Sequence, residues 1–174
     1  LSQLIPKDRL EKDYGLLGDK WKLYLDLLEK NLKNGISNSE AALAIALWAA
    51  REKGAQINYR SLSDHFLPSK KIRNIDKLKE DLIEADCILH SGPVYFGDRS
   101  SLGQELVQLI RKDDGLRKSL EYKIFAGITV GAKRNGGQET ARIYQILDMT
   151  AQGLLSVGNH NQTAAQDGRT CRAG

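Results

Sequence analysis

The spacing of apolar residues along the first third of the chain predicts two helices. In residues 21–33, one tryptophan and three leucines recur at intervals of four, three and four, which places them on one helical face. Ser37 and Glu40 have the spacing of a capping box. The alanine-rich segment behind them predicts a second helix that ends at Gly54.

The remaining chain alternates between the patterns of strands and helices. Residues 123–132 are apolar on both faces and rich in β-branched side chains, as in a buried strand. The predicted elements are, in order, a strand at 56–61, a helix at 75–85, a strand from 87 that breaks at Gly92 and Pro93, a helix at 101–112, a strand at 123–132, a helix at 138–150 and a strand at 154–157.

This alternation is typical of an α/β protein with a doubly wound parallel sheet and helices on both faces. In such a sheet, ligands bind beyond the carboxyl ends of the strands. Two of those ends carry the loops SGPVYFGD and GAKRNGGQE, at residues 91–98 and 131–139. We therefore expect a functional site at these loops.

Composition and charge narrow the class of protein. With 174 residues, 41% of them hydrophobic and 28% charged, the chain fits one globular domain. It has no apolar run long enough for a membrane span, and its first residues do not resemble a signal peptide, so we expect a cytoplasmic protein. A net charge of only +4, with basic and acidic residues interspersed, argues against a nucleic-acid partner.

Cysteine content excludes further classes. Cys87 and Cys171 are the two cysteines of the chain, too few for a disulfide framework or a four-ligand metal site. An iron–sulfur cluster held by this chain alone is excluded for the same reason, since such clusters take four thiolates. We therefore expect no metal site.

The first loop could bind a flat heteroaromatic ligand. Gly92 and Pro93 turn the chain at a strand end, and Tyr95 and Phe96 follow with aromatic area suited to stacking. The alternative is that Tyr95 and Phe96 close the end of the core. His90 lies near the same strand end, but a single histidine beside an apolar strand is more often structural, so we give it no catalytic role.

The second loop could hold a negatively charged ligand. Gly136 and Gly137 allow a close approach of backbone N–H groups, and Lys133 and Arg134 favour negative charge. The alternative is an ordinary turn.

A third candidate site is the start of the alanine-rich helix. Ser37, Asn38 and Ser39 combine small polar side chains with free N–H groups, which suits a phosphate, although helix capping explains the same residues. The three candidates together lie where an α/β sheet places a nucleotide.

The order of these segments resembles the flavodoxin-like NAD(P)H-dependent FMN reductases and quinone reductases. The matching motifs are SNSE before the alanine-rich helix, EAD before a strand that ends in GPVYFGD, and GGQE after the next strand. The resemblance covers residues 34–159. It implies a flavodoxin-like fold, FMN as cofactor, NAD(P)H as co-substrate, a small-molecule electron acceptor and a homo-oligomer. It requires no side-chain acid or base.

The resemblance also assigns roles to residues at matching positions. It implies that the loop at the helix start holds the FMN phosphate and that the two strand-end loops flank the flavin ring. The implied phosphate residues are Ser37, Asn38 and Ser39, and the implied ring residues are Pro93, Val94, Tyr95, Phe96, Gly97, Asn135, Gly136, Gly137 and Gln138.

Some features of the family pattern are not evident in this sequence. The first strand is not visible before residue 34, the arginine of the phosphate loop is missing, and no covering helix follows the last strand. The first strand could lie upstream, with residues 1–33 inserted in the phosphate loop, or a helix could replace it. We expect a helical extension or insertion at 1–33, a flavodoxin-like domain at 34–159 and a truncated C-terminal loop at 160–174.

Three functions are compatible with this pattern. The first is an FMN-dependent oxidoreductase that passes electrons from NAD(P)H to a quinone, a flavin or another small acceptor. The second is a flavodoxin-like electron carrier, although such carriers are typically acidic and this chain is not. The third is a degenerate flavodoxin-like interaction module without flavin.

Overall fold

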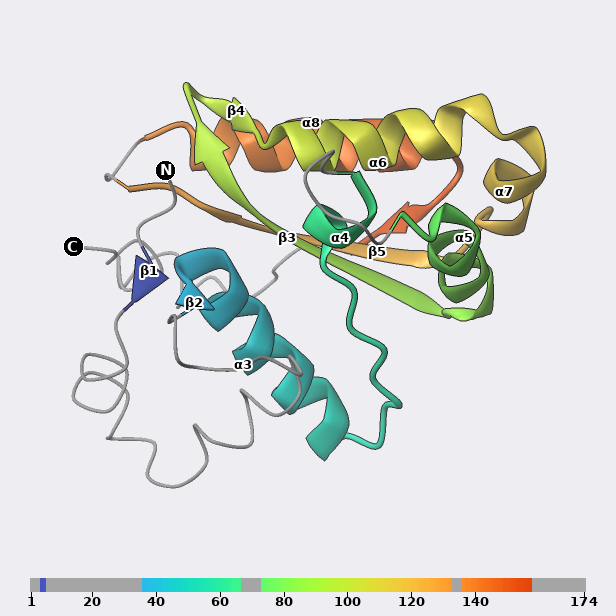
Figure 1. Ribbon diagram of the computed structural model, residues 1–174, viewed down its shortest axis with the longest axis horizontal. Coiled ribbons are helices and arrows are strands. Elements are labelled where there is room, and N and C mark those ends of the chain that lie inside the picture. Colours follow the sequence, from blue (N-terminus) through green and yellow to red (C-terminus); the bar gives the residue numbers. More distant parts are fainter. Residues whose placement is uncertain (1–3, 6–35, 67–72, 133–135, 158–174) are drawn as a thin grey trace. The chain divides into compact units, whose positions relative to one another are not determined.

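The computed structural model describes residues 4–5, 36–66, 73–132 and 136–157, and the chain forms two compact units, Leu1–Tyr59 and Arg60–Gly174 (Figure 1). In the first unit, strand β1 (Leu4–Ile5) pairs antiparallel with strand β2 (Ile36–Ser37), and helix α3 (Asn38–Glu52) follows directly. The helix predicted after Ser37 is therefore confirmed. The helix predicted at 21–33 lies outside the described residues.

The second unit is built on a four-stranded sheet of order β4-β3-β5-β6. Strands β3 (Cys87–Tyr95), β5 (Ile124–Val130) and β6 (Leu155–Ser156) are parallel neighbours, and the short strand β4 (Asp98–Arg99) pairs antiparallel with β3. The predicted α/β architecture with a mainly parallel sheet is confirmed.

Among the described residues of the second unit, five helices accompany this sheet, and two of them cover the same face of it (Figure 1). A Cβ on Gly103 of α6 would lie 3.0 Å from the His90 ring, and one on Gly127 would lie 2.4 Å from Gln145 of α8. His90 and Gly127 are direct neighbours across β3 and β5, so α6 and α8 share a face. The helices are α4 (Leu62–Phe66), α5 (Ile75–Glu84), α6 (Ser101–Lys112), α7 (Asp114–Ser119) and α8 (Gln138–Ala151).

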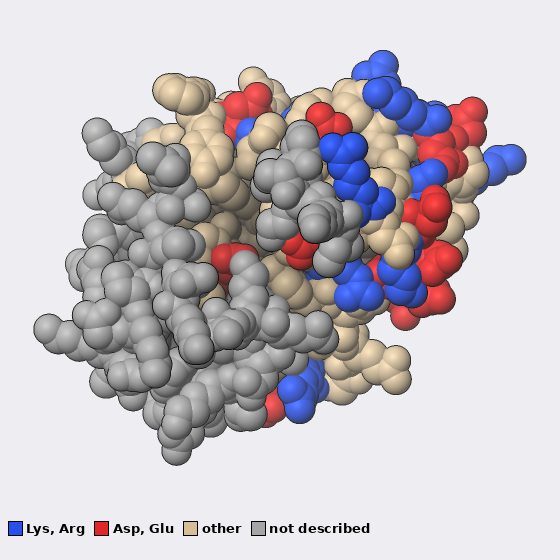
Figure 2. All heavy atoms as spheres, viewed as in Figure 1, with Lys and Arg blue, Asp and Glu red and all other residues tan. Residues whose placement is uncertain are grey.

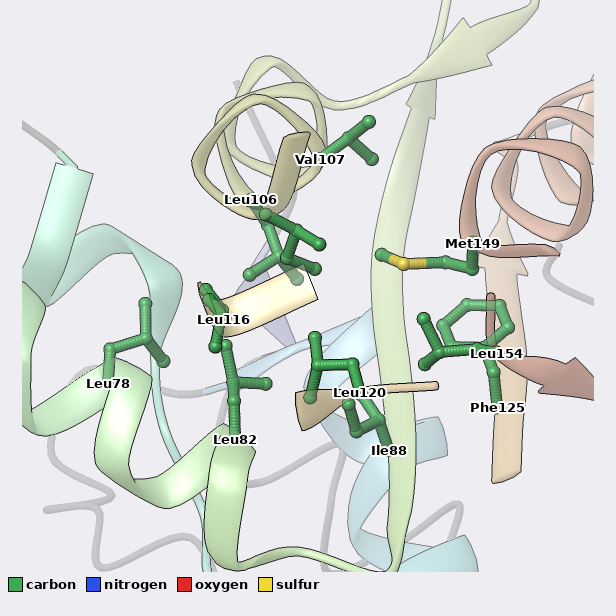
Figure 3. Packing of buried hydrophobic residues seen from close by; sticks show 11 residues of the cluster. Leu78, Leu82, Ile88, Leu106, Val107, Leu116, Leu120, Phe125, Met149 and Leu154 are labelled. Carbon is green, nitrogen blue, oxygen red and sulfur yellow. The ribbon is translucent and has the colours of Figure 1, made fainter. Parts of the chain in front are cut away.

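The apolar core of the second unit lies between this face of the sheet and the helices (Figure 3). Phe125 of β5 and Ile110 of α6 are completely buried, and Met149 of α8 is almost so. Leu78 and Leu82 bring α5 into the same cluster. Burial of each such side chain contributes about 1.5–3 kcal/mol, so this cluster stabilises the sheet that carries the strand-end loops.

Hydrogen bonds at its last turn and a salt bridge near its middle hold α5 in place. Lys123 donates hydrogen bonds from Nζ to the carbonyl oxygens of Ile83 and Ala85, at 2.7 and 2.5 Å, and so satisfies the last turn of the helix. Charges of both signs alternate over α5 and α7 (Figure 2), for example in the 2.7 Å pair of Lys79 and Asp113. The hydrogen bond from Lys79 holds the pKa of Asp113 below its ordinary value.

Three expectations about elements are wrong. Residues 55–61 form no strand, and α4 follows them. Strand β3 continues through Gly92 and Pro93 to Tyr95, and Gly92 and Pro93 stay in register with Thr129 and Val130 of β5. Helix α7 was not expected; it begins at Asp114, after the N-cap Asp113, whose carboxylate accepts a 2.9 Å hydrogen bond from the N–H of Leu116.

Strand β4 and helix α4 were not predicted either. Helices α5, α6 and α8 and strands β5 and β6 lie where the sequence places them, within one or two residues at their ends. None of the helices in the described part of the chain is long and apolar enough to cross a membrane.

Candidate functional site

The two strand-end loops touch each other in the second unit. A Cβ on Gly137 would lie 2.4 Å from Cα of Gly97 and 3.2 Å from its carbonyl carbon, so the two backbones are in direct contact. Gly137 has φ +93° and Gly97 has φ +80°, a region that favours glycine. The loops SGPVYFGD and GGQE therefore form one continuous structure at the carboxyl ends of β3 and β5.

The tip of the first loop presents its aromatic side chains to solvent. Phe96 and Gly97 connect β3 to β4 as a two-residue hairpin turn in which both residues have positive φ, as in a type I′ turn. Phe96 is fully exposed and Tyr95 is 40% exposed. Closure of the core, the alternative role considered for these residues, does not apply to Phe96. An exposed ring at the tip of a hairpin is available for stacking.

Arg99 fixes this hairpin to both helices. Its guanidinium donates two hydrogen bonds to the side-chain oxygen of Gln104 on α6, at 2.9 and 2.5 Å. It also lies 2.6 Å from a carboxylate oxygen of Asp148 and 5.8 Å above the ring of Tyr144, both on α8. The role of Arg99 was not predicted, and its position two residues after the Phe96–Gly97 turn is the single sequence signal for it.

A second anchor holds the start of α8. The hydroxyl of Thr129, near the end of β5, donates a 2.8 Å hydrogen bond to the carbonyl oxygen of Gln138. This bond closes the loop after β5 onto its own strand. Together with Arg99 it leaves both glycine loops anchored on secondary structure, as a preorganised binding site requires.

A buried polar pair lies in the core below the loops. His90 of β3 and Gln145 of α8 are 8% and 2% exposed, and Nδ1 of His90 has no hydrogen-bonding partner within the described residues. Gly92 and Gly103 leave room for the imidazole, since a Cβ on either would lie 3.6 or 3.0 Å from its Cε1. Burial lowers the pKa of His90 to about 4, Arg99 adds to this and Gln145 partly offsets it. A neutral, enclosed imidazole suits the structural role assigned to His90.

The candidate phosphate residues belong to the first unit and form a capping box. The hydroxyl of Ser37 accepts a hydrogen bond from the N–H of Glu40, and the Glu40 carboxylate accepts 2.8 Å hydrogen bonds from both the N–H and the hydroxyl of Ser37. The hydroxyl of Ser39 lies 3.2 Å from that of Ser37. Capping therefore accounts for Ser37, and a phosphate here would compete with the carboxylate of Glu40.

The structure brings together part of the predicted set. Pro93, Val94, Tyr95 and Phe96 lie on or directly after β3, while Gly97, Gly136, Gly137 and Gln138 form the paired loops. Ser37, Asn38 and Ser39 belong to the other unit. Asn135, Lys133 and Arg134 lie outside the described residues.

No group of three or more histidine, cysteine or acidic residues that could hold a metal ion occurs in the part of the chain that the structure describes. Cys87 is a free thiol at the start of β3, and partial burial raises its pKa, which favours the protonated form.

Parallel strands, two touching glycine loops at their carboxyl ends and an exposed aromatic hairpin define an α/β protein whose candidate site lies at the strand ends. Comparison with known proteins gives its family. The family of NADPH-dependent FMN reductases matches residues 32–163, and the chain belongs to this family. Its fold is accordingly flavodoxin-like, and the protein is a flavin-dependent oxidoreductase of the FMN-binding type.

Two curated proteins are similar to this chain over most of its length. The chain is 31% identical over 147 residues to an iron–sulfur flavoprotein of Methanocaldococcus jannaschii. These aligned residues cover 75% of this chain and 74% of that protein. It is 30% identical over 141 residues to an iron–sulfur flavoprotein of Methanosarcina thermophila, with 71% and 72% covered.

Proposed function

We propose that this protein uses FMN to pass electrons from NAD(P)H to a quinone, a free flavin or another small acceptor. The observation that supports this best is the contact of Gly97 with Gly137, which joins the two ring loops of the family beneath the exposed side chains of Phe96 and Tyr95. An exposed thiol at Cys87 fits the reducing cytoplasm, where we place the protein.

The residues of the second unit fit the ring of FMN. The paired loops offer backbone close to any bound ring, because no side chain stands at Gly97 or Gly137. Phe96 and Tyr95 offer aromatic surface for stacking, and Arg99 holds them in place. When bound, FMN supplies the redox chemistry itself. The protein's part is then to bind the ring, to orient the co-substrate against it and to exclude water.

The relatives are iron–sulfur flavoproteins. This chain has fewer cysteines than an iron–sulfur cluster needs. An iron–sulfur cluster takes four cysteine thiolates, and this chain has Cys87 and Cys171. We therefore propose that flavin alone carries the redox function of these 174 residues.

The first test is NAD(P)H oxidation by the FMN-loaded protein. We expect steady turnover with an added quinone or free FMN. The decrease in NAD(P)H absorbance measures this turnover. An electron carrier or a module without flavin would give essentially no turnover, so this assay separates the proposed function from both alternatives.

Phe96→Ala is expected to weaken FMN binding about two- to tenfold, because an aromatic pair contributes about 0.5–1.5 kcal/mol beyond its burial. Flavin fluorescence quenching on titration measures this. Tyr122→Ala is the matched control, since Tyr122 is also an exposed aromatic residue with positive φ but lies outside both loops. Equal FMN affinity in the two variants would contradict stacking at Phe96.

If the start of α3 holds the FMN phosphate, substitutions there should act in opposite directions. Ser37→Ala with Ser39→Ala should weaken FMN at least several-fold, because a charge-assisted hydrogen bond contributes about 1.5–3 kcal/mol. Glu40→Gln should tighten FMN, because it keeps the capping box and removes the competing negative charge. Riboflavin, which lacks the phosphate, is the control ligand and should bind all variants equally. Unchanged FMN affinity throughout would contradict the phosphate assignment.

A further inference from the structure

The hairpin formed by β3 and β4 projects beyond the parallel part of the sheet. Strand β3 is in register with β5 as far as Pro93, and its last residues, Val94 and Tyr95, pair with Arg99 and Asp98 of β4. A hairpin of two strands alone is marginally stable in water. The orientation of this hairpin therefore depends on its contacts with the rest of the protein.

Two contacts with the adjacent helix α8 set this orientation (Figure 1), and they lie far apart along the helix. At one end, Gly97 touches Gly137, the residue directly before the first turn of α8. At the other end, the Arg99 guanidinium lies 2.6 Å from a carboxylate oxygen of Asp148 and 5.8 Å from the ring centroid of Tyr144. Asp148 follows Gly137 by eleven positions, which is about 16 Å along a helix. One contact would leave the hairpin free to pivot, whereas two contacts at this separation fix its angle.

The contact at the far end depends on an ion pair that is mostly enclosed. The side chains of Arg99 and Asp148 are 12% and 33% exposed. Gln104 accepts the other hydrogen bonds of the guanidinium, but its amide carries no charge. Without the Asp148 carboxylate, the guanidinium loses its counter-charge, and a charged group without one is costly to hold away from water. We then expect it to turn towards solvent and to release this end of the hairpin from α8.

Helix α8 also carries the second ring loop. The GGQE loop leads directly into the first turn of α8, and the hydroxyl of Thr129 holds that end through the carbonyl oxygen of Gln138. The same helix therefore carries one loop at its start and sets the angle of the other through a side chain in its last turn. Releasing the far end of the hairpin changes how the two loops face each other, although no residue in either loop is altered.

We propose that Asp148 is a positioning residue of the flavin reaction, which acts through Arg99 to fix the aromatic hairpin against the GGQE loop. This inference rests on the proposed function, because that function assigns the paired loops to the flavin ring. A misplacement of reacting groups by about 1 Å can reduce a rate about a hundredfold. A contact that sets the angle of one loop should therefore affect the rate of turnover more than the affinity for FMN.

The test uses variants of the full, FMN-loaded chain. In Asp148→Ala, the turnover of NAD(P)H at saturating FMN should fall at least about tenfold. The affinity for FMN should fall by less than about twofold, because no aromatic contact with the ring is removed. Alanine is the best helix former, so α8 itself is retained in this variant.

Arg99→Met and the double variant with Asp148→Ala test the route of the effect. Methionine keeps a long unbranched side chain but has neither a charge nor an N–H donor. If Asp148 acts through Arg99, the double variant should turn over as slowly as Arg99→Met alone, because the interaction is already lost. Rate losses that multiply in the double variant would mean that Asp148 acts by another route and would overturn the proposal, as would full turnover in Asp148→Ala.

Lys79→Met is the matched control for the loss of an ion pair. Lys79 and Asp113 form a 2.7 Å pair with side-chain exposures of 29% and 33%, and both residues lie outside the ring loops. This variant should keep its turnover and its affinity for FMN, even if its free energy of unfolding falls as much as in Asp148→Ala. An equal loss of turnover in the two variants would identify general destabilisation as the cause and would overturn the proposal.

Circular dichroism of bound FMN in the visible range provides a readout that does not need turnover. Its bands depend on the asymmetric surroundings of the ring, so they should change in Asp148→Ala and Arg99→Met and stay the same in Lys79→Met. If the unchanged protein binds FMN but does not oxidise NAD(P)H, the proposed function fails and the bands still decide the role of Asp148. Unchanged bands in Asp148→Ala would overturn that role, and a chain that binds no FMN would overturn both proposals.

Discussion

Gly137→Ala is expected to weaken FMN binding by at least about tenfold, which corresponds to about 1.4 kcal/mol. The new Cβ would lie 2.4 Å from Cα of Gly97 and 3.3 Å from its nitrogen. Both atoms belong to the backbone, which cannot rotate away as a flexible side chain can. The two loops must therefore separate, and the ring site they form together is lost. Alanine at φ +93° adds a local cost of about 1–2 kcal/mol.

Gly54→Ala separates the loop contact from the cost of positive φ. Gly54 has φ +91°, but a Cβ there would meet no atom within 4 Å. This variant should lose about 1–2 kcal/mol of unfolding free energy and keep its affinity for FMN. Flavin fluorescence titrations and denaturant unfolding of both variants provide the comparison. If Gly137→Ala bound FMN as tightly as Gly54→Ala, the contact between the loops would not be part of the flavin site.

The sequence predicts the position of the loops better than their contact. Glycine pairs and aromatic residues after apolar segments can be read directly from SGPVYFGD and GGQE. That Gly97 and Gly137 touch depends on the register of β3 and β5, which sets Pro93 beside Val130. Register is a property of strands paired across more than thirty residues of chain, and no local pattern specifies it.

Errors in secondary structure arose where local signals were weak. Residues 56–61 alternate imperfectly between polar and apolar side chains, and the structure has no strand there. Helix α7 has six residues, too few for a helical repeat of apolar positions to be visible. The capping residue Asp113 was the sequence signal for this helix. By contrast α6, with its longer amphipathic pattern, begins and ends where the sequence predicts.

Residues whose roles depend on contacts with other secondary-structure elements could not be identified from the sequence. Arg99 connects β4 with Gln104 and Asp148, which lie 5 and 49 positions further along the chain. His90 is enclosed by Gly92, Gly103 and Gln145 from three elements. Both are ordinary polar residues in the sequence, and their roles follow from the packing of α6 and α8 on one face of the sheet.

His90 is expected to make the protein about 3 kcal/mol less stable at pH 4 than at pH 7. Burial lowers the pKa of His90 from 6.5 to about 4 in the folded state, and one pKa unit corresponds to about 1.4 kcal/mol. Above pH 6.5 the imidazole is neutral in both the folded and the unfolded state, so it does not change the free energy of unfolding. Between pH 6.5 and 4 the unfolded chain takes up a proton that the folded protein does not, so the free energy of unfolding falls. Below pH 4 both states are protonated and the loss is complete.

Denaturant unfolding at half-unit steps between pH 7.5 and 4 measures this loss. In His90→Gln, which cannot take up the proton, the decline over this range should largely disappear, even if the variant is less stable at pH 7. The pKa can also be followed directly by NMR, since the chain has three histidines. A His90 resonance that titrates near pH 6.5 in the folded protein would contradict the expected acid sensitivity, because an imidazole packed between Gly92 and Gly103 could then accept a proton without first opening the core.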